Sequence, residues 1–282
     1  MLFEISHTTI YSYDRPVFFE PHAFRLKPRQ DSALKLLDFN LTIEPSPAGS
    51  TDALDVDGNA VTQAWFSGTW SSLVIKAVSK TEAATRNPFD FIFPDPAAAK
   101  LPLRYAPSTA ATLAPYLARA HASAEVDGWT KSIARSAGDA TMPFLVALCR
   151  EIRNQSVYTI REEGDPNSAA DTLKDKRGSC RDLAVLFMDA CRAQGIAARF
   201  VSGYHDSHLK EGKRYMHAWG EVYLPGGGWR AFDPTLGLAV TDGHIAVAAA
   251  ADPKDAAPVM GTFRGGAVEK SLQADIEIAI LR

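Results

Sequence analysis

The sequence has 282 residues, of which 46% are hydrophobic and 22% are charged, and its formal net charge is −3. This balance is typical of a globular protein with a full core, and the length suits one large or two ordinary domains. The negative charge argues against a nucleic-acid partner, because phosphate binding needs a basic surface. No run of about 18 apolar residues occurs, so neither a membrane span nor a membrane partner is expected.

The first residues, MLFEISHTTIYSYDRP, read as a strand and have neither the basic start nor the apolar stretch of a secretory signal. The three cysteines, Cys149, Cys180 and Cys191, form no CxxC pair, so neither a disulfide framework nor a zinc ribbon is expected. Cys149 and Cys191 lie in helical patterns and are interpreted as small buried hydrophobes. The sequence therefore predicts a cytoplasmic protein.

Residues 1–104 have the pattern of an N-terminal antiparallel β-sandwich. Apolar and polar residues alternate in HTTIYSYDRPV and in DFNLTIEP, and WSSLVIKAVSK reads as a further strand. Asp57-Gly58 between apolar runs predicts a hairpin turn. Such spacing of strands and turns favours a sandwich. Five of the 17 prolines fall within residues 88–107, which indicates a boundary or an extended connector there.

Residues 105–282 have a different period. Helical patterns cover residues 108–122, 126–138, 141–155 and 180–194. Strand patterns follow, at residues 196–205, 216–225, 228–235, 244–250 and 272–280. Helices followed by an antiparallel sheet predict an α+β domain. The fold class expected for the whole chain is therefore α+β, with two domains.

Cys180 lies where a helix is expected to begin. Ser179 and Asp182 have the spacing of a capping box, with aspartate in place of glutamate. Cys180 would then be the first helical residue, beside free backbone N–H groups and the positive end of the helix dipole, which favours the thiolate over the thiol. Residues 180, 184, 187 and 191 share one face, so we expect a buried helix whose start opens on a cleft. The alternative is that Cys180 is one more small hydrophobe.

A thiolate nucleophile needs a base and a group that orients the base. His217 and Asp233 each lie eight residues from Pro225, in the expected turn LPGGG between two strands. We therefore expect them to lie level in an antiparallel hairpin and to share one face. An aspartate beside a histidine fixes its tautomer, as a Cys–His–Asp triad requires. Taken singly, His217 also fits a half-buried sheet histidine and Asp233 a turn residue.

At this point the sequence resembles the bacterial transglutaminase-like superfamily, and within it a group of cysteine proteases with a distinctive N-terminal region. The resemblance rests on HTTIYSYDRPVFFEPHAFRLKPR, RGSCRDLAVLFMDACRAQGIAARFVSGY, HAWGEVYLPGGGWRAFDPT and HIAVAAAADPKDAAPVMGTFRGG. It implies a papain-like α+β core in which Cys180 is the nucleophile, His217 the base and acid, and Asp233 the orienting residue. The chain departs from the family pattern at Arg181, where many members have glutamine.

The implied reaction is acyl transfer from a peptide or glutamine amide. The Cys180 thiolate attacks the carbonyl carbon, His217 protonates the leaving amine, and the resulting thioester is cleaved by water or by an amine, with hydrolysis favoured over crosslinking. The backbone N–H of Cys180 is the expected first oxyanion donor. Tyr158, Arg181 and Trp219 are candidates for substrate binding or for the second donor.

Two other functions stay open. One is a catalytically degenerate scaffold that binds a peptide or protein partner without turnover. The other is a metal hydrolase built on His205, Asp206 and His208, although a solvated loop is the favoured interpretation of these residues because no third anchored ligand group is evident. No EF-hand loop occurs, and no cofactor is expected. The N-terminal sandwich is assigned a packing and substrate-cleft role, and the oligomeric state is left open.

Overall fold

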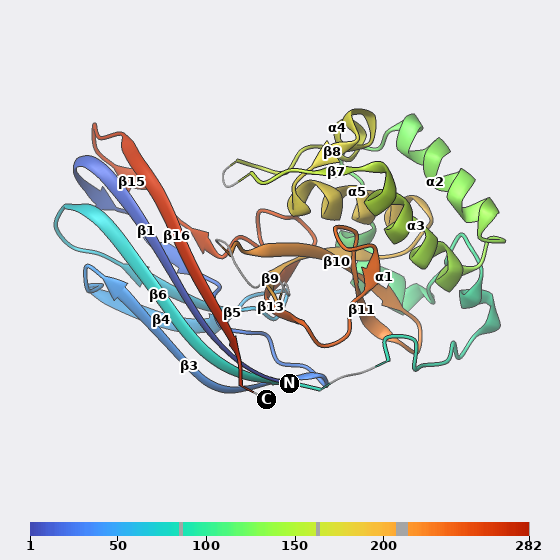
Figure 1. The fold of residues 1–282 in the computed structure, drawn as a ribbon, viewed down its shortest axis with the longest axis horizontal. Coiled ribbons are helices and arrows are strands. Elements are labelled where there is room, and N and C mark those ends of the chain that lie inside the picture. Colours follow the sequence, from blue (N-terminus) through green and yellow to red (C-terminus); the bar gives the residue numbers. More distant parts are fainter. Residues whose placement is uncertain (85–86, 162–163, 207–213, 282) are drawn as a thin grey trace.

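The computed structural model describes residues 1–84, 87–161, 164–206 and 214–281, and it has an α+β fold in two halves (Figure 1). One half is a pair of antiparallel sheets, and the other is a group of helices over a third sheet. The predicted fold class is confirmed. None of the described helices has the length and apolarity that a membrane crossing requires.

The first sheet of the sandwich contains the longest strands. Its order is β15–β1–β6–β3, and β16 also pairs with β1, along residues 3–13, whereas β15 pairs with residues 18–19; all pairs are antiparallel. The strands are β1 (Leu2–Phe19), β3 (Leu34–Glu44), β6 (Trp70–Ala83), β15 (Phe263–Arg264) and β16 (Glu269–Ile280). Every second residue at the start of β1 is buried, including Phe3, Ile5 and His7, because alternate side chains of a strand point to opposite faces.

The second sheet of the sandwich is smaller and has the order β14–β2–β5–β4. Its strands are β2 (His22–Phe24), β4 (Gly49–Leu54), β5 (Ala60–Trp65) and β14 (Val259–Met260). Phe24 and Ala64 of this sheet pack with Phe19, Leu73 and Ile75 of the first sheet in one buried cluster. The predicted N-terminal sandwich is therefore confirmed, and so is the hairpin turn at Asp57-Gly58, which joins β4 to β5.

The last strand lies in a different sheet from the one expected. Residues 272–280 were expected to join the sheet of the second half, but β16 pairs with β1 from Phe3↔Ile280 to Tyr13↔Glu269. The alternating pattern predicts a strand but does not select its partner, and an uncovered edge of β1 would present unpaired N–H and C=O groups. The ranges 1–104 and 105–282 need this correction: β14, β15 and β16 complete the sandwich, which contains both ends of the described chain (Figure 1).

The helices of the second half include one buried helix, α5, and the others lie around it. They are η1 (Pro96–Ala99), α1 (Pro107–Leu117), α2 (Ala124–Ser136), α3 (Thr141–Gln155), α4 (Ala169–Asp175) and α5 (Cys180–Ala193), with a short parallel pair, β7 (Val157–Tyr158) and β8 (Arg177–Gly178). The helical pattern of the sequence extends to residue 122, but α1 ends at Leu117. Arg119 is instead paired with Asp127 and Asp189, at 2.6 and 2.7 Å, so tertiary ion pairs override the local pattern.

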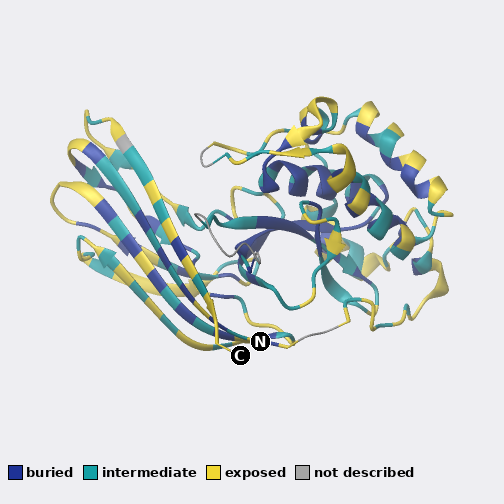
Figure 2. Cartoon of the chain, in the orientation of Figure 1, coloured by how far each residue is buried: buried dark blue, intermediate teal, exposed yellow. Residues whose placement is uncertain are grey.

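The third sheet has the order β12–β11–β10–β9–β13, and its pairs are antiparallel. Its strands are β9 (Ala198–His205), β10 (His217–Leu224), β11 (Gly228–Asp233), β12 (Leu238–Ala239) and β13 (His244–Ala250). α5 packs across it, with the Phe187 ring stacked on Phe232 at 5.8 Å between centroids. Figure 2 shows α5 and the strands beneath it as the most continuously buried part of the second half.

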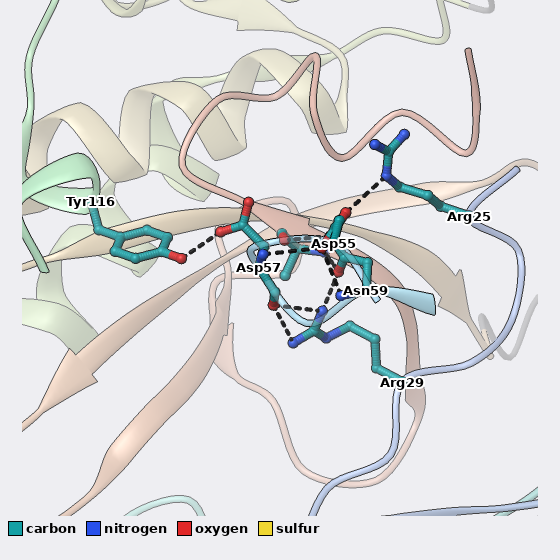
Figure 3. Close-up of polar contacts among 7 residues, drawn as sticks. Arg25, Arg29, Asp55, Asp57, Asn59 and Tyr116 are labelled. Carbon is teal, nitrogen blue, oxygen red and sulfur yellow. Dashed lines mark hydrogen bonds and ion pairs between the residues drawn. The ribbon is translucent and has the colours of Figure 1, made fainter. Parts of the chain in front are cut away.

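The halves meet at a shared apolar cluster and at the hairpin turn between β4 and β5. Phe3, Ile5 and Ile276 of the sandwich share a buried cluster with Tyr204 and Ile245 of the third sheet. In addition, the hairpin turn between β4 and β5 reaches β13, where the buried Asn59 side chain donates to Ala249 O at 3.0 Å and accepts from Ala249 N at 2.8 Å. Arg29 and Tyr116 hold the same turn through the Asp57 backbone and side chain (Figure 3).

We expect Asn59→Ala to lower the free energy of unfolding by about 3 kcal/mol, because the variant leaves the N–H and C=O of Ala249 buried without partners. Urea unfolding followed by tryptophan fluorescence measures the change. Asn40→Ala is the matched control, since Asn40 is exposed and its side chain donates to Thr42 of its own strand. It should change stability by less than about 0.5 kcal/mol. Equal effects of the two variants would contradict the role given to Asn59.

Candidate active site

Cys180 is the first residue of α5, as the capping pattern predicts. Asp182 holds this start: its Oδ2 accepts hydrogen bonds from the backbone N–H of Ser179 at 2.7 Å and from the Ser179 hydroxyl at 2.8 Å. Its Oδ1 accepts from Arg161 at 2.5 Å and from the Asn167 backbone at 2.7 Å. One buried carboxylate therefore fixes both the start of α5 and the segment that runs beside it.

The predicted face of α5 is buried, since Ala184, Phe187 and Cys191 are inaccessible and Cys180 is 7% exposed. Cys180 nevertheless lines a cleft of about 480 Å³ between the two halves. The near wall comes from the second half and includes Tyr158, Arg181 and His217. The far wall comes from the sandwich and includes His7, Thr9, Tyr11, Val259, Glu269, Leu272 and Ala274.

His217 and Asp233 lie on one face of the β10–β11 hairpin, and His217 Nε2 is 2.6 Å from Asp233 Oδ2. They are not level, however. The pairs Leu224↔Gly228 and Gly220↔Phe232 centre the turn on Gly226 rather than on Pro225, so the two residues are diagonal neighbours. The prediction of direct opposition is wrong, because the sequence LPGGG does not fix which residue takes the left-handed conformation that Gly226 adopts (φ 79°). The shared face is confirmed, since an offset of two residues preserves it.

Asp233 is fully buried, and all its hydrogen bonds come from donors around it. Its Oδ1 accepts from the backbone N–H groups of Thr235 and Leu236, at 2.8 and 3.2 Å. Burial alone would raise the pKa of this carboxyl, but the charge and hydrogen bonds of the neighbouring histidines hold its pKa well below the usual range. Asp233 is therefore a carboxylate that can only accept, so the proton of the shared bond belongs to His217 Nε2.

His217 joins this carboxylate to Cys180. Burial by itself lowers the pKa of His217, but the charge and hydrogen bond of Asp233, together with those of Cys180, raise its pKa to about 10. Because Asp233 occupies Nε2, the other ring nitrogen, Nδ1, is left for the sulfur. The arrangement can hold an imidazolium beside a thiolate, and it can deliver a proton from Nδ1 to a group that leaves from the Cys180 side.

The three further candidate residues have different places. Tyr158 lines the cleft together with Cys180, and burial, with a smaller effect of the neighbouring Cys180, raises the pKa of Tyr158 to about 12, so it keeps its proton at neutral pH. Arg181 lines the cleft, and its guanidinium donates hydrogen bonds to the carbonyl oxygens of Gly164 and Arg161, at 2.8 and 2.7 Å. Trp219 is 1% exposed and lies against the His217 ring, with centroids 6.1 Å apart. Trp219 therefore supports His217 and does not reach a substrate.

His244 is a member of the site that the sequence interpretation missed. Its Nε2 is 2.9 Å from Asp233 Oδ2, the same oxygen that His217 contacts, and its side chain is 4% exposed. The sequence showed only the strand HIAVAAA. The available signal was a histidine at the start of a buried strand, because a buried imidazole needs a polar partner.

The nitrogen and oxygen atoms of His217, Asp233 and His244 lie within 4.8 Å of one another, a grouping that a metal ion could in principle use. The separations at the shared oxygen are 2.6 and 2.9 Å, whereas tetrahedral zinc keeps its nitrogen and oxygen ligands about 3.3 Å apart. Both distances are those of hydrogen bonds. We therefore interpret the group as a hydrogen-bonded unit.

For His205 and Asp206, the two described members of the 205–208 cluster, the solvated loop expected from the sequence is wrong, because His205 is the last residue of β9 and Asp206 directly follows it. Asp206 is buried and lies 3.8 Å from Arg214, and the His205 ring packs 4.3 Å from that of His244. His208 lies outside the described residues. Burial next to the hairpin, which the loop composition does not reveal, makes His205 part of the surroundings of Asp233.

Comparisons with known proteins give matches in both halves of the chain. The sequence pattern described as the transglutaminase-like superfamily matches residues 127–234, which include Cys180, His217 and Asp233. The pattern described as the bacterial transglutaminase-like N-terminal region matches residues 3–82. The two matches together show that both halves of the chain are similar to transglutaminase-like proteins. The resemblance stated from the sequence is thereby confirmed.

Two relatives match parts of this chain. An uncharacterized protein of Mycobacterium leprae is 33% identical over 138 residues, which are 47% of this chain and 49% of the relative. A protein-glutamine gamma-glutamyltransferase of Pseudomonas aeruginosa is 33% identical over 94 residues, which are 29% of this chain and 14% of the relative. The chain thus spans about half of the first relative and a small part of the second.

A solved structure shows the same fold over the whole chain. The crystal structure of a candidate cysteine protease from Cytophaga hutchinsonii matches with a TM-score of 0.72 and 22% sequence identity. The match covers 100% of this chain and 91% of that chain. The arrangement of sandwich and α+β core is therefore shared with that protein.

Proposed function

We propose that the protein is a cysteine-dependent acyl-transfer enzyme that attacks peptide or glutamine amides, with Cys180 as nucleophile, His217 as base and acid, and Asp233 as orienting residue. The observation that carries the proposal is the place of His217, which is hydrogen-bonded at Nε2 to the buried Asp233 and lines the same cleft as Cys180 at the start of a buried helix. A nucleophile, a base and an orienting group in this order are the requirements for covalent catalysis.

The first step of the proposed reaction is attack of the Cys180 sulfur on the amide carbonyl carbon, which forms a C–S bond and places negative charge on the oxygen. The free backbone N–H of Cys180 in the first turn of α5 is one donor for that oxygen. The Tyr158 hydroxyl, which lies beside the sulfur, is the second donor that we favour. His217 then gives its Nδ1 proton to the nitrogen, the C–N bond breaks, and a thioester remains on Cys180.

The thioester needs an acceptor. Water attacks it with His217 as general base, which restores the thiolate and gives hydrolysis or deamidation; an amine in the same place gives crosslinking. We favour hydrolysis, because the cleft is reached by solvent, as the 43% exposure of Tyr158 indicates, and water is always present as the acceptor.

The proposed substrate is a peptide or protein segment bound between the halves. Aromatic and aliphatic side chains of both walls face the cleft, among them Tyr11, Ile160 and Met216, and such a lining suits an extended chain. This gives the sandwich the substrate-cleft role expected of it. The cytoplasmic location stays a prediction, compatible with the three free cysteines.

The second candidate function, a scaffold that binds a partner without turnover, makes a different prediction about Cys180. A binding module does not need the Cys180 thiol to depend on His217. We therefore measure alkylation by iodoacetamide at each cysteine, by mass spectrometry between pH 5 and 9, in the wild type and in His217→Ala.

We expect Cys180 of the wild type to react at pH 6.5 about tenfold or more faster than a free cysteine, and His217→Ala to lose this advantage. Cys149 and Cys191 serve as internal controls, because burial raises the pKa of both thiols and leaves them unreactive. If Cys180 alkylates like a free thiol in both proteins, the catalytic function fails and the scaffold function replaces it.

A further inference from the structure

His244 occupies a well-defined place behind the proposed triad. It is the first residue of β13, which pairs with β9 on the side away from β10, and His244 lies level with His205. Its ring meets Trp219 edge-on at 5.0 Å and His205 at 4.3 Å between centroids. The Trp219 ring therefore contacts both histidines that bind Asp233, His217 on one side and His244 on the other.

A glycine allows the strands to come this close. Gly203 of β9 lies level with His217 on β10 and with Ala246 on β13. A Cβ at this position would collide with the backbone oxygen of Ile245 and would stand 2.6 Å from the Trp219 ring. The approach that brings His244 to Asp233 is thus built into the sheet.

The hydrogen bonds of Asp233 are complete only when His244 is counted. A carboxylate offers about four acceptor positions, and here four donors fill them: two backbone N–H groups at Oδ1, and His217 and His244 at Oδ2. Without His244, the fully buried Oδ2 would keep His217 as a single donor, and the position of that oxygen would be fixed less tightly than with two donors.

The two histidines have opposite protonation tendencies. Burial lowers the pKa of His244, against the effect of Asp233, so at neutral pH it is the neutral tautomer with its proton on Nε2. The charged or titratable groups that face it are Asp233, His217, His205 and Asp242. His217, by contrast, is held in its protonated form. His244 is therefore a constant donor while His217 exchanges its proton.

We propose that His244 is a positioning residue of this site, a second histidine whose Nε2–H shares Asp233 Oδ2 with His217 and so fixes the carboxylate in line with the catalytic imidazole. The inference rests on the proposed function, because it assigns His244 a part in the same reaction. His244 acts through Asp233 and touches neither the substrate nor Cys180.

The test compares two variants at this position. His244→Gln keeps an N–H donor near the place of Nε2, and His244→Leu has a similar volume without a donor. We expect the rate of Cys180 acylation by 4-nitrophenyl acetate to fall about 10–100-fold in His244→Leu and less than about fivefold in His244→Gln. The pH profile of Cys180 alkylation should shift to higher pH in His244→Leu and return toward the wild type in His244→Gln.

A merely structural role would give a different result. His22→Leu, a change at a buried histidine of the sandwich, is the control for loss of stability without a change in the profile. If His244→Leu loses stability as this control does but keeps the wild-type pH profile, or if its profile moves to lower pH, the positioning role is overturned. The failure of the proposed function is distinguishable, because the wild type would then show no His217-dependent alkylation at all.

Discussion

Cys180→Ala is expected to slow acylation by 4-nitrophenyl acetate about 10³-fold or more, to the rate of the buffer reaction. The change removes the sulfur that forms the C–S bond, while an alanine in the first turn of α5 keeps the helix. Stopped-flow release of 4-nitrophenol measures the rate, and intact-mass analysis shows whether one acetyl group is carried by the protein.

Cys149→Ala and Cys191→Ala are the matched controls, because both thiols are buried in helices away from the cleft. They should retain the acylation burst, and peptide mapping should place the acetyl group on Cys180. A burst that survives in Cys180→Ala would show that another residue is the nucleophile. An acetyl group found on a lysine would contradict the role of Cys180 in the same way.

Asp233→Asn is expected to lower the same rate about 10²–10⁴-fold with little effect on overall fold. The comparable change in a serine-protease triad costs about 10⁴-fold, because the amide favours the wrong histidine tautomer. In this protein the variant also removes the charge that holds the pKa of His217 at about 10, and burial then lowers that pKa. His217 would lose its proton near neutral pH, and Cys180 would lose its cationic partner.

The same variant tests the pair through stability. The folded-state pKa of His217 is raised above its unfolded value, so its contribution is complete below about pH 6.5 and is lost as the pH rises through about 10. The folded-state pKa of Asp233 is lowered, so its contribution exists above about pH 4 and is lost on acidification. Breaking a buried pair of this kind costs about 3 kcal/mol.

The free energies of unfolding of the wild type and of Asp233→Asn, measured with urea, should therefore differ most between about pH 4 and 6.5, and the difference should shrink as the pH rises toward about 10. Asp38→Asn, at an exposed position of the sandwich, is the control and should change stability by less than about 0.5 kcal/mol. A difference that does not depend on pH would mean that His217 and Asp233 do not share a proton in the folded protein.

The resemblance identified the family from the sequence, and local patterns predicted several elements of the site. Ser179 and Asp182 predicted the start of α5 at Cys180, because a capping box acts within one turn of a helix. The even separation of His217 and Asp233, 16 residues along the hairpin, predicted their shared face, because side chains alternate along every strand. The Asp57-Gly58 turn and the strands beside it followed from the conformational freedom of glycine and from alternation.

Only the tertiary structure decided which distant segments meet. The sequence shows that residues 272–280 form a strand but not that β16 covers the edge of β1 and, with β1, forms the far wall of the cleft. It shows a histidine at position 244 but not its bond to Asp233, and it leaves Trp219 as a substrate contact when the ring lies buried against His217. Capping, alternation and turn preferences act over a few residues of chain, whereas these contacts depend on the order of strands in the sheets, which no local pattern encodes.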